Sequence, residues 1–326
     1  MSGVGSKVTS IAWIVGGGFA AWAAARLLAV DRVRRTEVPA VQFVSFTPQV
    51  AAAAPWAALG LRLARRRGPA AAASLAAALL YLLLLPRGIR HPQPAARGPV
   101  VRLLSANVFF GRADADAIVA RVRESGADVL FLQELTEDAV SRLKLAGLDE
   151  LMPHNQLELR GGGPHASDGS GIYARFPLSD GPAVVPISKA QPSALLELPG
   201  GGALELICIH PCAPGLRRWG GAARWREELG LLPAAASRPR VLAGDFNATL
   251  DHAAFRDVLR LGYADAALQA GKALTPTWGL PGKTRAVLTL DHVLVDLSCA
   301  VRDYSVHVIP GSDHRAVYAE IQLPGR

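Results

Sequence analysis

Three long runs without a charged side chain lie near the start of this 326-residue chain. They cover residues 8 to 25, 38 to 61 and 68 to 86, which are 18, 24 and 19 residues long. A helix that crosses a bilayer needs about 17 to 25 apolar residues, so the runs predict three transmembrane helices, over residues 8–30, 38–61 and 68–86. A cleaved signal peptide is the alternative for the first run, but it leaves the other two unexplained.

Charge divides the chain as sharply as hydropathy does. Residues 1 to 97 contain 12 Lys and Arg against Asp31 and Glu37, whereas residues 98 to 326 contain 23 against 25. The first part therefore carries +10 and the second −2, so the excess positive charge of the chain, +8 in total, comes from the apolar part. Because phosphate neutralisation supplies most non-specific affinity for a duplex, the near-neutral second part is not typical of a dedicated DNA-binding enzyme.

The arginines also indicate an orientation. Arg62, Arg65, Arg66 and Arg67 form a compact cluster between the second and third runs, which favours a cytoplasmic loop there and a C-terminal domain outside the cell. A raw count of Lys and Arg slightly favours the opposite orientation, so both stay open. The composition predicts a multi-pass cell-membrane anchor (1–86), a linker rich in Pro, Gly and Arg (87–99) and a second domain (100–326).

Short apolar runs replace the long ones from residue 100 onward. They predict strands at 100–105, 128–132, 203–209, 240–243, 288–295, 301–308 and 317–323, and a helix at 115–123. Polar residues lie at or near the ends of these strands, where loops gather at one rim of a sheet. The set is Asn107, Glu134, His210, Asp245, Asn247, Asp291, Asp313 and His314.

These residue types suit the cleavage of a phosphate ester. Hard cations such as Mg²⁺ prefer carboxylate and amide oxygens, which Glu134 and Asp313 supply. The attacking water needs a positioned base, and a histidine held by a carboxylate, as His314 is by Asp291, fits that task. The set therefore predicts a metal-assisted phosphoesterase.

The motifs around these residues resemble the endonuclease/exonuclease/phosphatase superfamily, in that family's order and over nearly all of residues 100 to 323. The resemblance implies an α+β fold of two packed β-sheets flanked by helices, a four-layer α/β sandwich of the DNase I type, here preceded by three transmembrane helices. It also implies a bacterial membrane-bound branch whose catalytic domain faces outward. The strongest motifs are Gly244-Asp245-Phe246-Asn247 and Ser312-Asp313-His314, supported by Gln133-Glu134, His210-Pro211 and Thr277-Trp278.

The same resemblance implies a Mg²⁺ cofactor, with Mn²⁺ as a substitute. Glu134 becomes the principal metal ligand, with Asn107 and Asp313 close to the same ion. Asp245 and Asn247, two residues apart, are expected on the same side of a local extended turn.

The remaining roles concern the water and the phosphate. The resemblance assigns the orientation or deprotonation of water to Asp245 and hydrogen-bond donation to a phosphoryl oxygen to Asn247. His210 stabilises developing charge, and His314, fixed by Asp291, acts as a base or as a second phosphate donor. Which of Asp245 and His314 takes the proton stays open.

Several residues outside this set allow two interpretations, one functional and one structural. Trp278 either packs in the core or contacts the site. Arg175 and Arg224 either bind phosphate or form surface ion pairs. His292 points to the opposite strand face if its strand is regular, and it is left out of the site.

The sequence does not name the substrate. Relatives with the same core residues act on DNA, on phospholipids and on nucleotides, so a nuclease and a phosphodiesterase of a phospholipid or another envelope diester both stay open. A membrane-anchored scaffold that keeps the fold without turnover is the other class of function. The complete set of polar residues disfavours the scaffold, because inactive relatives typically lose a metal carboxylate or the terminal histidine.

Overall fold

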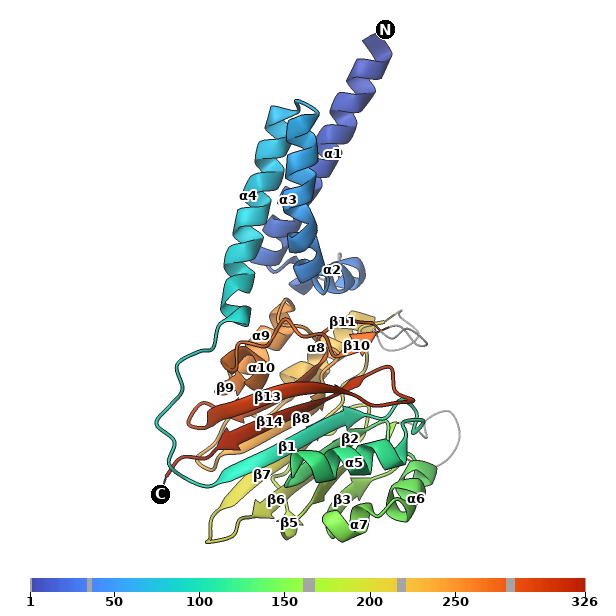
Figure 1. The fold of residues 1–326 in the computed structure, drawn as a ribbon, viewed down its shortest axis with the longest axis vertical. Coiled ribbons are helices and arrows are strands. Elements are labelled where there is room, and N and C mark those ends of the chain that lie inside the picture. The colour runs from blue at the N-terminus through green and yellow to red at the C-terminus, as the bar shows by residue number, and fades with distance from the viewer. Residues whose placement is uncertain (1, 34–36, 161–167, 216–220, 280–284, 326) are drawn as a thin grey trace.

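The structure, a computed structural model, places a helical arm on a two-sheet domain (Figure 1). It describes residues 2–33, 37–160, 168–215, 221–279 and 285–325. The arm, residues 2–88, consists of α1 (Ser2–Leu27), the 3₁₀ helix η1 (Val30–Arg32), α2 (Glu37–Val44), α3 (Thr47–Leu63), α4 (Arg67–Leu84) and the 3₁₀ helix η2 (Leu85–Gly88).

The three long helices of the arm pack through small side chains. Ala51 of α3 and Ala73 and Ala76 of α4 are fully or almost fully buried, and such residues let helix backbones approach closely. Large apolar side chains face outward instead, as Trp56 does with 74% of its surface exposed. A contiguous apolar exterior of this kind marks a surface that contacts lipid or another protein.

The predicted second span, residues 38–61, is not one helix. The chain breaks between α2 and α3, where the Ser45 hydroxyl donates to the Val41 and Gln42 carbonyls and the Thr47 hydroxyl donates to the Val44 carbonyl. Pro48 then occupies the first turn of α3, where its missing N–H leaves no helical hydrogen bond unmade. Within the described ranges, Lys7–Leu27 and Arg67–Gly88 are long and apolar enough to cross a membrane, whereas α3 has only 17 residues.

The second domain contains two six-stranded sheets, as the resemblance implied. The first has the order β13-β14-β1-β2-β4-β3 and the second β5-β6-β7-β8-β12-β9. The strands of the first are β1 (Val100–Asn107), β2 (Val129–Gln133), β3 (His154–Glu158), β4 (Ser170–Ala174), β13 (Ala300–Val308) and β14 (Arg315–Gln322). Those of the second are β5 (Leu178–Asp180), β6 (Ser193–Glu197), β7 (Ala203–Ile209), β8 (Arg240–Asp245), β9 (Tyr263–Asp265) and β12 (Asp291–Asp296).

Both faces of the central strands are buried. Leu103 points into the core between the two sheets, and its neighbour Leu104 points into a second core against helices, because successive strand residues face opposite ways. Helices cover the outer face of each sheet (Figure 1). They are α5 (Ala115–Ser125), α6 (Glu137–Leu145) and α7 (Leu148–Leu151) on the first, and α8 (Gly221–Gly230), α9 (Ala253–Leu259) and α10 (Ala266–Gln269) on the second.

A small hairpin interrupts one predicted strand. The segment expected at 288–295 is divided between β11 (Ala286–Leu288), which pairs with β10 (Trp278–Gly279), and β12. The Thr277 hydroxyl accepts hydrogen bonds from the Leu290 and Asp291 amides at 3.0 and 3.1 Å. These bonds stabilise the break and fix the start of β12.

The predicted linker is an ordered strap along the second domain. The Gly98 amide donates to the Leu323 carbonyl at 2.9 Å, and the His91 amide donates to the Gln269 carbonyl at 3.0 Å. Gln93 accepts a hydrogen bond from the Val301 amide at 2.7 Å. The arm is therefore held to the domain by more than its covalent connection.

Candidate active site

All eight predicted site residues lie at one rim of the two sheets. β1 and β2 run parallel, as do β7 and β8, so these four strands end together. β14 is antiparallel to β1 and β12 is antiparallel to β8, so both begin where their partners end. The pairing Asp245↔Asp291 shows this register directly. Below, this edge is called the active-site rim.

Asn107, at the end of β1, bridges two carboxylates. Its Nδ2 donates to Glu134 Oε1 and to Asp245 Oδ2, each at 3.1 Å, and its Oδ1 accepts from the Phe109 amide at 2.9 Å. Glu134 Oε2 accepts from the Phe110 amide at 2.8 Å. The Asn107 side chain thus orients two acids, and its oxygen keeps one lone pair for a further partner.

The backbone of the rim is strained where these residues lie. Glu134 has φ +57° and Asn247 has φ +50°, in the left-handed region that residues other than glycine rarely adopt. The Asn247 amide donates to Asp245 Oδ1 at 2.8 Å. The predicted extended turn at Asp245 and Asn247 is therefore a tight left-handed turn, and strain of this kind concentrates at functional sites.

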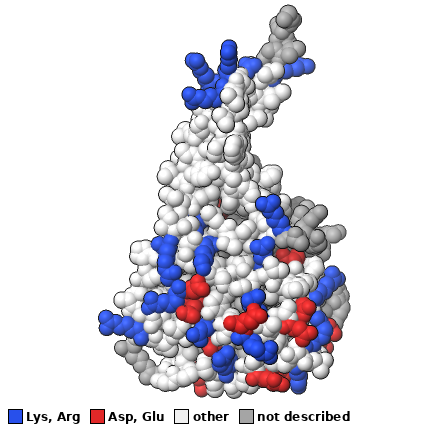
Figure 2. All heavy atoms as spheres, in the orientation of Figure 1, with Lys and Arg blue, Asp and Glu red and all other residues white. Residues whose placement is uncertain are grey.

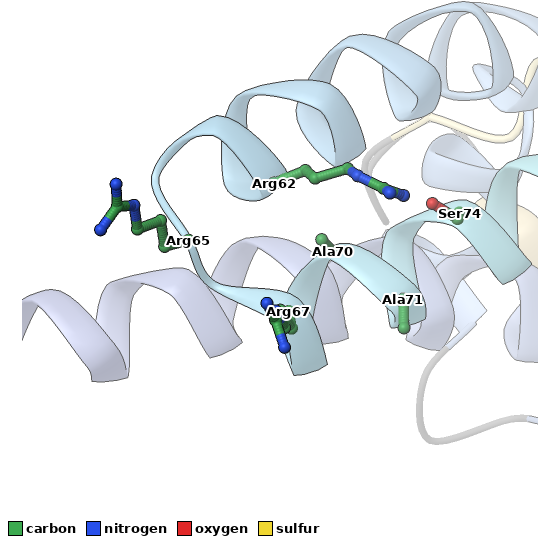
Figure 3. A pocket seen from close by; sticks show the side chains of 6 residues that line it. All are labelled: Arg62, Arg65, Arg67, Ala70, Ala71 and Ser74. Atoms are coloured by element: carbon green, nitrogen blue, oxygen red, sulfur yellow. The ribbon is translucent and has the colours of Figure 1, made fainter.

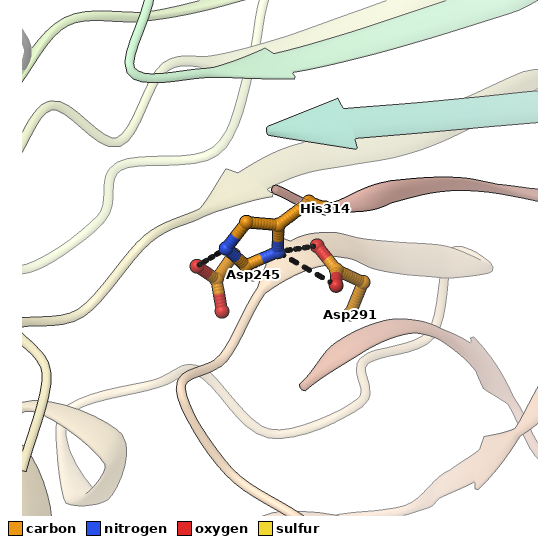
Figure 4. Close-up of side chains that lie close together, drawn as sticks. All are labelled: Asp245, Asp291 and His314. Carbon is orange, nitrogen blue, oxygen red and sulfur yellow. Dashed lines mark hydrogen bonds and ion pairs between the residues drawn. The ribbon is translucent and has the colours of Figure 1, made fainter. Parts of the chain in front are cut away.

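His314 lies between two aspartates (Figure 4). Its Nδ1 donates to Asp291 at 2.9 and 3.1 Å, and its Nε2 lies 3.6 Å from Asp245 Oδ2. Although burial opposes a charge on the ring, the Asp291 and Asp245 carboxylates raise the pKa of His314 to about 10. Burial raises the pKa of Asp245 to about 6, against the opposing charge of His314.

These three side chains offer ligand atoms within 4.8 Å of one another. The His314 ring is already committed to Asp291 through Nδ1, and the pKa of about 10 keeps it protonated at neutral pH, so it is not free to bind a cation. The group is better described as a hydrogen-bonded His–Asp pair facing a third carboxylate.

The Asp313 carboxylate indicates whether the rim suits a metal ion. Its Oδ2 accepts from the Trp278 indole at 3.1 Å, while its Oδ1 is buried and has no hydrogen-bond partner among the described residues. Burial raises the pKa of this carboxyl, and the nearby Glu134 charge contributes to the rise. An orphaned carboxylate oxygen beside a second acid, with an amide oxygen nearby, fits a hard divalent cation.

Lys189 is a site residue that the sequence did not reveal. Its Nζ donates to His210 Nε2 at 2.8 Å, and His210 Nε2 lies 3.9 Å from Glu134 and 3.8 Å from Asp245. Burial lowers the pKa of His210 well below its ordinary value, and the Lys189 and His314 charges lower it further. His210 is therefore neutral, with its proton on the buried Nδ1, and the cation at this point of the rim is Lys189.

Of the four other residues considered from the sequence, one contacts the site and three do not. Trp278 is half-buried and contacts the site through Asp313. Arg224 pairs with Glu228 within α8 at 3.1 Å, and Arg175 lies 3.9 Å from Asp128 near the opposite ends of the strands, so the ion-pair reading holds for both. His292 faces away, as predicted, and its Nδ1 lies 2.7 Å from Asp265.

Asn247 makes a contact that its predicted role did not include. Its Nδ2 donates to the Pro211 carbonyl at 3.1 Å, which ties the loop after β8 to the loop after β7. One N–H of the amide remains for a substrate oxygen.

Comparison with known proteins identifies the family of the second domain. The model of the family described as "Endonuclease/Exonuclease/phosphatase family" matches residues 104–314. That range includes all eight predicted site residues and more than half of the chain. Among proteins with curated sequences, none matches the chain.

Several solved structures share the fold. An endonuclease/exonuclease/phosphatase from Beutenbergia cavernae DSM 12333 superposes with a TM-score of 0.55 and 21% identity, over 69% of this chain and 72% of its own. Humanised D. rerio TDP2 with 14 mutations gives 0.54 and 18%, over 68% and 98%. D. rerio TDP2 complexed with single strand DNA product gives 0.52 and 18%, over 68% and 98%. At these identities the likenesses show the fold alone.

Proposed function

This chain belongs to the endonuclease/exonuclease/phosphatase family, and from that premise we propose that it is a membrane-anchored, metal-dependent phosphodiesterase. The observation that carries the proposal is the meeting of two units at one rim. One unit is the acid pair Glu134 and Asp245 bridged by Asn107, and the other is His314 held by Asp291. Hydrolysis of a phosphate ester needs both a cation site and positioned proton-handling groups.

The metal site of the proposal consists of Glu134, Asp313 and the free lone pair of Asn107. These oxygens suit Mg²⁺, with Mn²⁺ as a substitute. When bound there, the ion supplies charge neutralisation for the phosphoryl oxygens. The orphaned Asp313 Oδ1 is the position in the rim that supports this assignment most directly.

The remaining residues act on water and phosphate. Asp245, buried and raised in pKa, orients the attacking water and accepts its proton. His314, protonated and fixed by Asp291, donates from Nε2 to a phosphoryl oxygen. Lys189 adds a second positive charge, and Asn247 adds an amide donor. Each preorganised donor of this kind is worth about 3 kcal/mol of transition-state stabilisation.

The arm supports the membrane assignment. Arg62, Arg65 and Arg67 gather at its far end, beside Ala70, Ala71 and Ser74 of α4 (Figure 3). The visible face between this tip and the domain is uncharged over most of its length (Figure 2). Basic residues at one end of an apolar helical bundle favour the cytoplasmic side. We place the tip inside the cell and the catalytic domain outside.

Orientation is tested by accessibility in intact cells. All three native cysteines are buried, so Arg65→Cys at the tip and Leu145→Cys on the domain give matched labelling sites. A membrane-impermeant maleimide is expected to label Leu145→Cys in intact cells and Arg65→Cys only after permeabilisation. The reverse pattern contradicts the orientation.

Activity is tested with the full chain in detergent, on bis-p-nitrophenyl phosphate with Mg²⁺ or Mn²⁺. Turnover that disappears in Glu134→Gln, with the thermal unfolding midpoint retained, supports the proposal. A catalytically silent protein, or turnover that survives the substitution, contradicts it.

A further inference from the structure

The arm and the domain are joined by a buried ion-pair cluster. Asp251, in the loop between β8 and α9, has a fully buried side chain. Arg26 at the end of α1 donates to Asp251 Oδ1 at 2.6 Å. Arg87 of η2 donates to both Asp251 oxygens, at 2.6 and 2.8 Å. A carboxylate clamped in this way by two guanidinium groups fixes the position of both helix ends relative to the domain.

Further contacts surround this cluster. Asp31 of η1 accepts from the Ala253 amide at the start of α9, at 2.7 Å. His252 Nε2 lies 2.8 Å from the Val41 carbonyl of α2. The arm therefore meets the domain through α1, η1, α2 and η2 together, which leaves little freedom for a hinge between them.

The active-site rim lies close to this junction. Asp251 follows Asp245 by six residues, which span at most about 22 Å when fully extended. A second series of contacts also links the arm to the rim. It begins with Gln49 of α3, which donates to the Val287 carbonyl of β11 at 2.5 Å. β11 pairs with β10, and Trp278 of β10 donates to Asp313. One two-stranded hairpin thus separates the arm from the proposed metal site.

The apolar surface of the arm reaches down to the domain. Phe43 of α2, which lies at the foot of the arm, is 59% exposed, although α2 itself contacts α8 (Figure 1). Other exposed apolar side chains at the foot are Leu27, Leu28, Phe46, Leu85 and Ile89. A bilayer that covers this surface ends at the top of the catalytic domain, because exposed aromatic and aliphatic groups sit at the membrane interface.

We propose that the substrate is the phosphodiester group of a lipid in the leaflet next to the domain, hydrolysed while the lipid remains in the bilayer. This inference rests on the function proposed above and adds the substrate class. Water adds its oxygen to phosphorus, one P–O ester bond breaks, and the leaving oxygen takes a proton, so the products are an alcohol and a phosphate monoester. The rigid junction holds the rim at the depth of the lipid headgroups.

The charge of the second domain favours a lipid substrate over a nucleic-acid polymer. From residue 98 to the end, 23 basic residues face 25 acidic ones, which gives no footprint for a polyanion. A single headgroup diester needs no long basic groove.

The test uses the full chain in proteoliposomes with Mg²⁺. Three classes of substrate are compared. They are phosphatidylcholine, phosphatidylethanolamine and phosphatidylglycerol in the vesicle, the matching soluble glycerophosphodiesters, and linear duplex DNA. We expect at least one lipid to be cleaved about tenfold or more faster than its soluble counterpart at equal bulk concentration, because the shared bilayer raises its local concentration. Faster cleavage of the soluble diester or of DNA overturns the inference and leaves the proposed function intact. No cleavage of any substrate with Mg²⁺ or Mn²⁺ overturns both.

A variant at the foot of the arm separates membrane access from chemistry. Phe43→Glu places a carboxylate on the exposed apolar surface, at a residue that is not one of the site residues. We expect lipid turnover to fall about fivefold or more while bis-p-nitrophenyl phosphate turnover stays within about twofold, because a charge at the interface weakens its contact with acyl chains. The matched control is Leu145→Glu at the end of α6, 88% exposed and distant from the arm, which is expected to change neither rate. Equal lipid turnover in Phe43→Glu and the control contradicts the inference.

Discussion

His314 Nδ1 contacts both carboxylate oxygens of Asp291, at 2.9 and 3.1 Å. Asp291 comes from the start of β12 and His314 directly precedes β14, so the pair joins the two sheets across the rim. Because this contact occupies Nδ1, the other ring nitrogen, Nε2, points toward Asp245.

Asp291→Asn is expected to remove this constraint without removing volume. The amide oxygen can accept a hydrogen bond but carries no charge to stabilise the imidazolium, so kcat/KM on bis-p-nitrophenyl phosphate should fall about 100-fold or more. Asp296→Asn at the far end of β12 is the control, because the hydrogen bonds that the described structure gives to the Asp296 side chain come from Ser298, two residues away. Equal activity of the two variants would argue that Asp291 has no part in the reaction.

Lys189→Ala is expected to lower kcat/KM about 100-fold, because it removes the positive charge that we propose acts on the phosphate. Lys189→Arg should restore part of the loss, since the charge is kept and only its geometry changes. Lys144→Ala, at an exposed lysine of α6, serves as the control. A purely structural Lys189 would give Ala and Arg variants of equal activity and altered stability.

Asp313→Asn tests the metal site through metal binding, independently of catalytic turnover. The substitution removes the negative charge from the oxygen that lacks a partner, so binding of Mn²⁺ measured by calorimetry should weaken about tenfold or more. Asp303→Asn, at an exposed carboxylate paired with Lys272, should bind as the wild type does. Unchanged affinity in Asp313→Asn would place the ion elsewhere.

Arg87→Ala tests the junction between arm and domain. It leaves the buried Asp251 carboxylate with one guanidinium in place of two, and breaking such a pair costs about 3–5 kcal/mol. Arg32→Ala breaks the Arg32–Asp257 pair, whose side chains are about half exposed, and should cost about 0–1 kcal/mol. Thermal unfolding of both variants in one detergent provides the comparison, and similar losses would contradict the account of the junction.

The same carboxylate predicts an acid limit for stability. Burial alone raises the pKa of Asp251, but the Arg87 and Arg26 charges outweigh it and hold that pKa below its ordinary value. A group with a lowered folded pKa stabilises fully above its unfolded pKa of about 4, and this contribution is lost as pH falls through the folded pKa. The unfolding midpoint of the wild type should therefore fall more steeply than that of Asp251→Asn below about pH 4. Parallel curves would exclude Asp251 as the cause.

The sequence predicted the centre of the fold well and its margins poorly. β1, β2, β7, β8 and β14 were recognisable because strands buried on both faces read as continuous apolar runs. β3, with the sequence His-Asn-Gln-Leu-Glu, is an edge strand whose polar residues carry no such signal. The break between α2 and α3 was missed because Ser45 and Pro48 are uncharged and do not interrupt an apolar window.

The site could be predicted for the residues that lie in motifs, since strand ends collect at a rim. Lys189 could not be, because it lies in an irregular segment between β5 and β6, and only the tertiary fold brings it to His210. The Asn107 bridge between Glu134 and Asp245 was likewise invisible, because it depends on both sheets being in place.

The dependence of phosphoesterase activity on a cation at this rim can be measured by titrating Mg²⁺ into the metal-stripped full chain while bis-p-nitrophenyl phosphate hydrolysis is followed. We expect turnover to rise from zero with Mg²⁺ and to saturate in the wild type, and to stay near zero at every Mg²⁺ concentration in Glu134→Gln. Hydrolysis that persists in the metal-stripped protein, or that is equal in Glu134→Gln, would contradict this expectation.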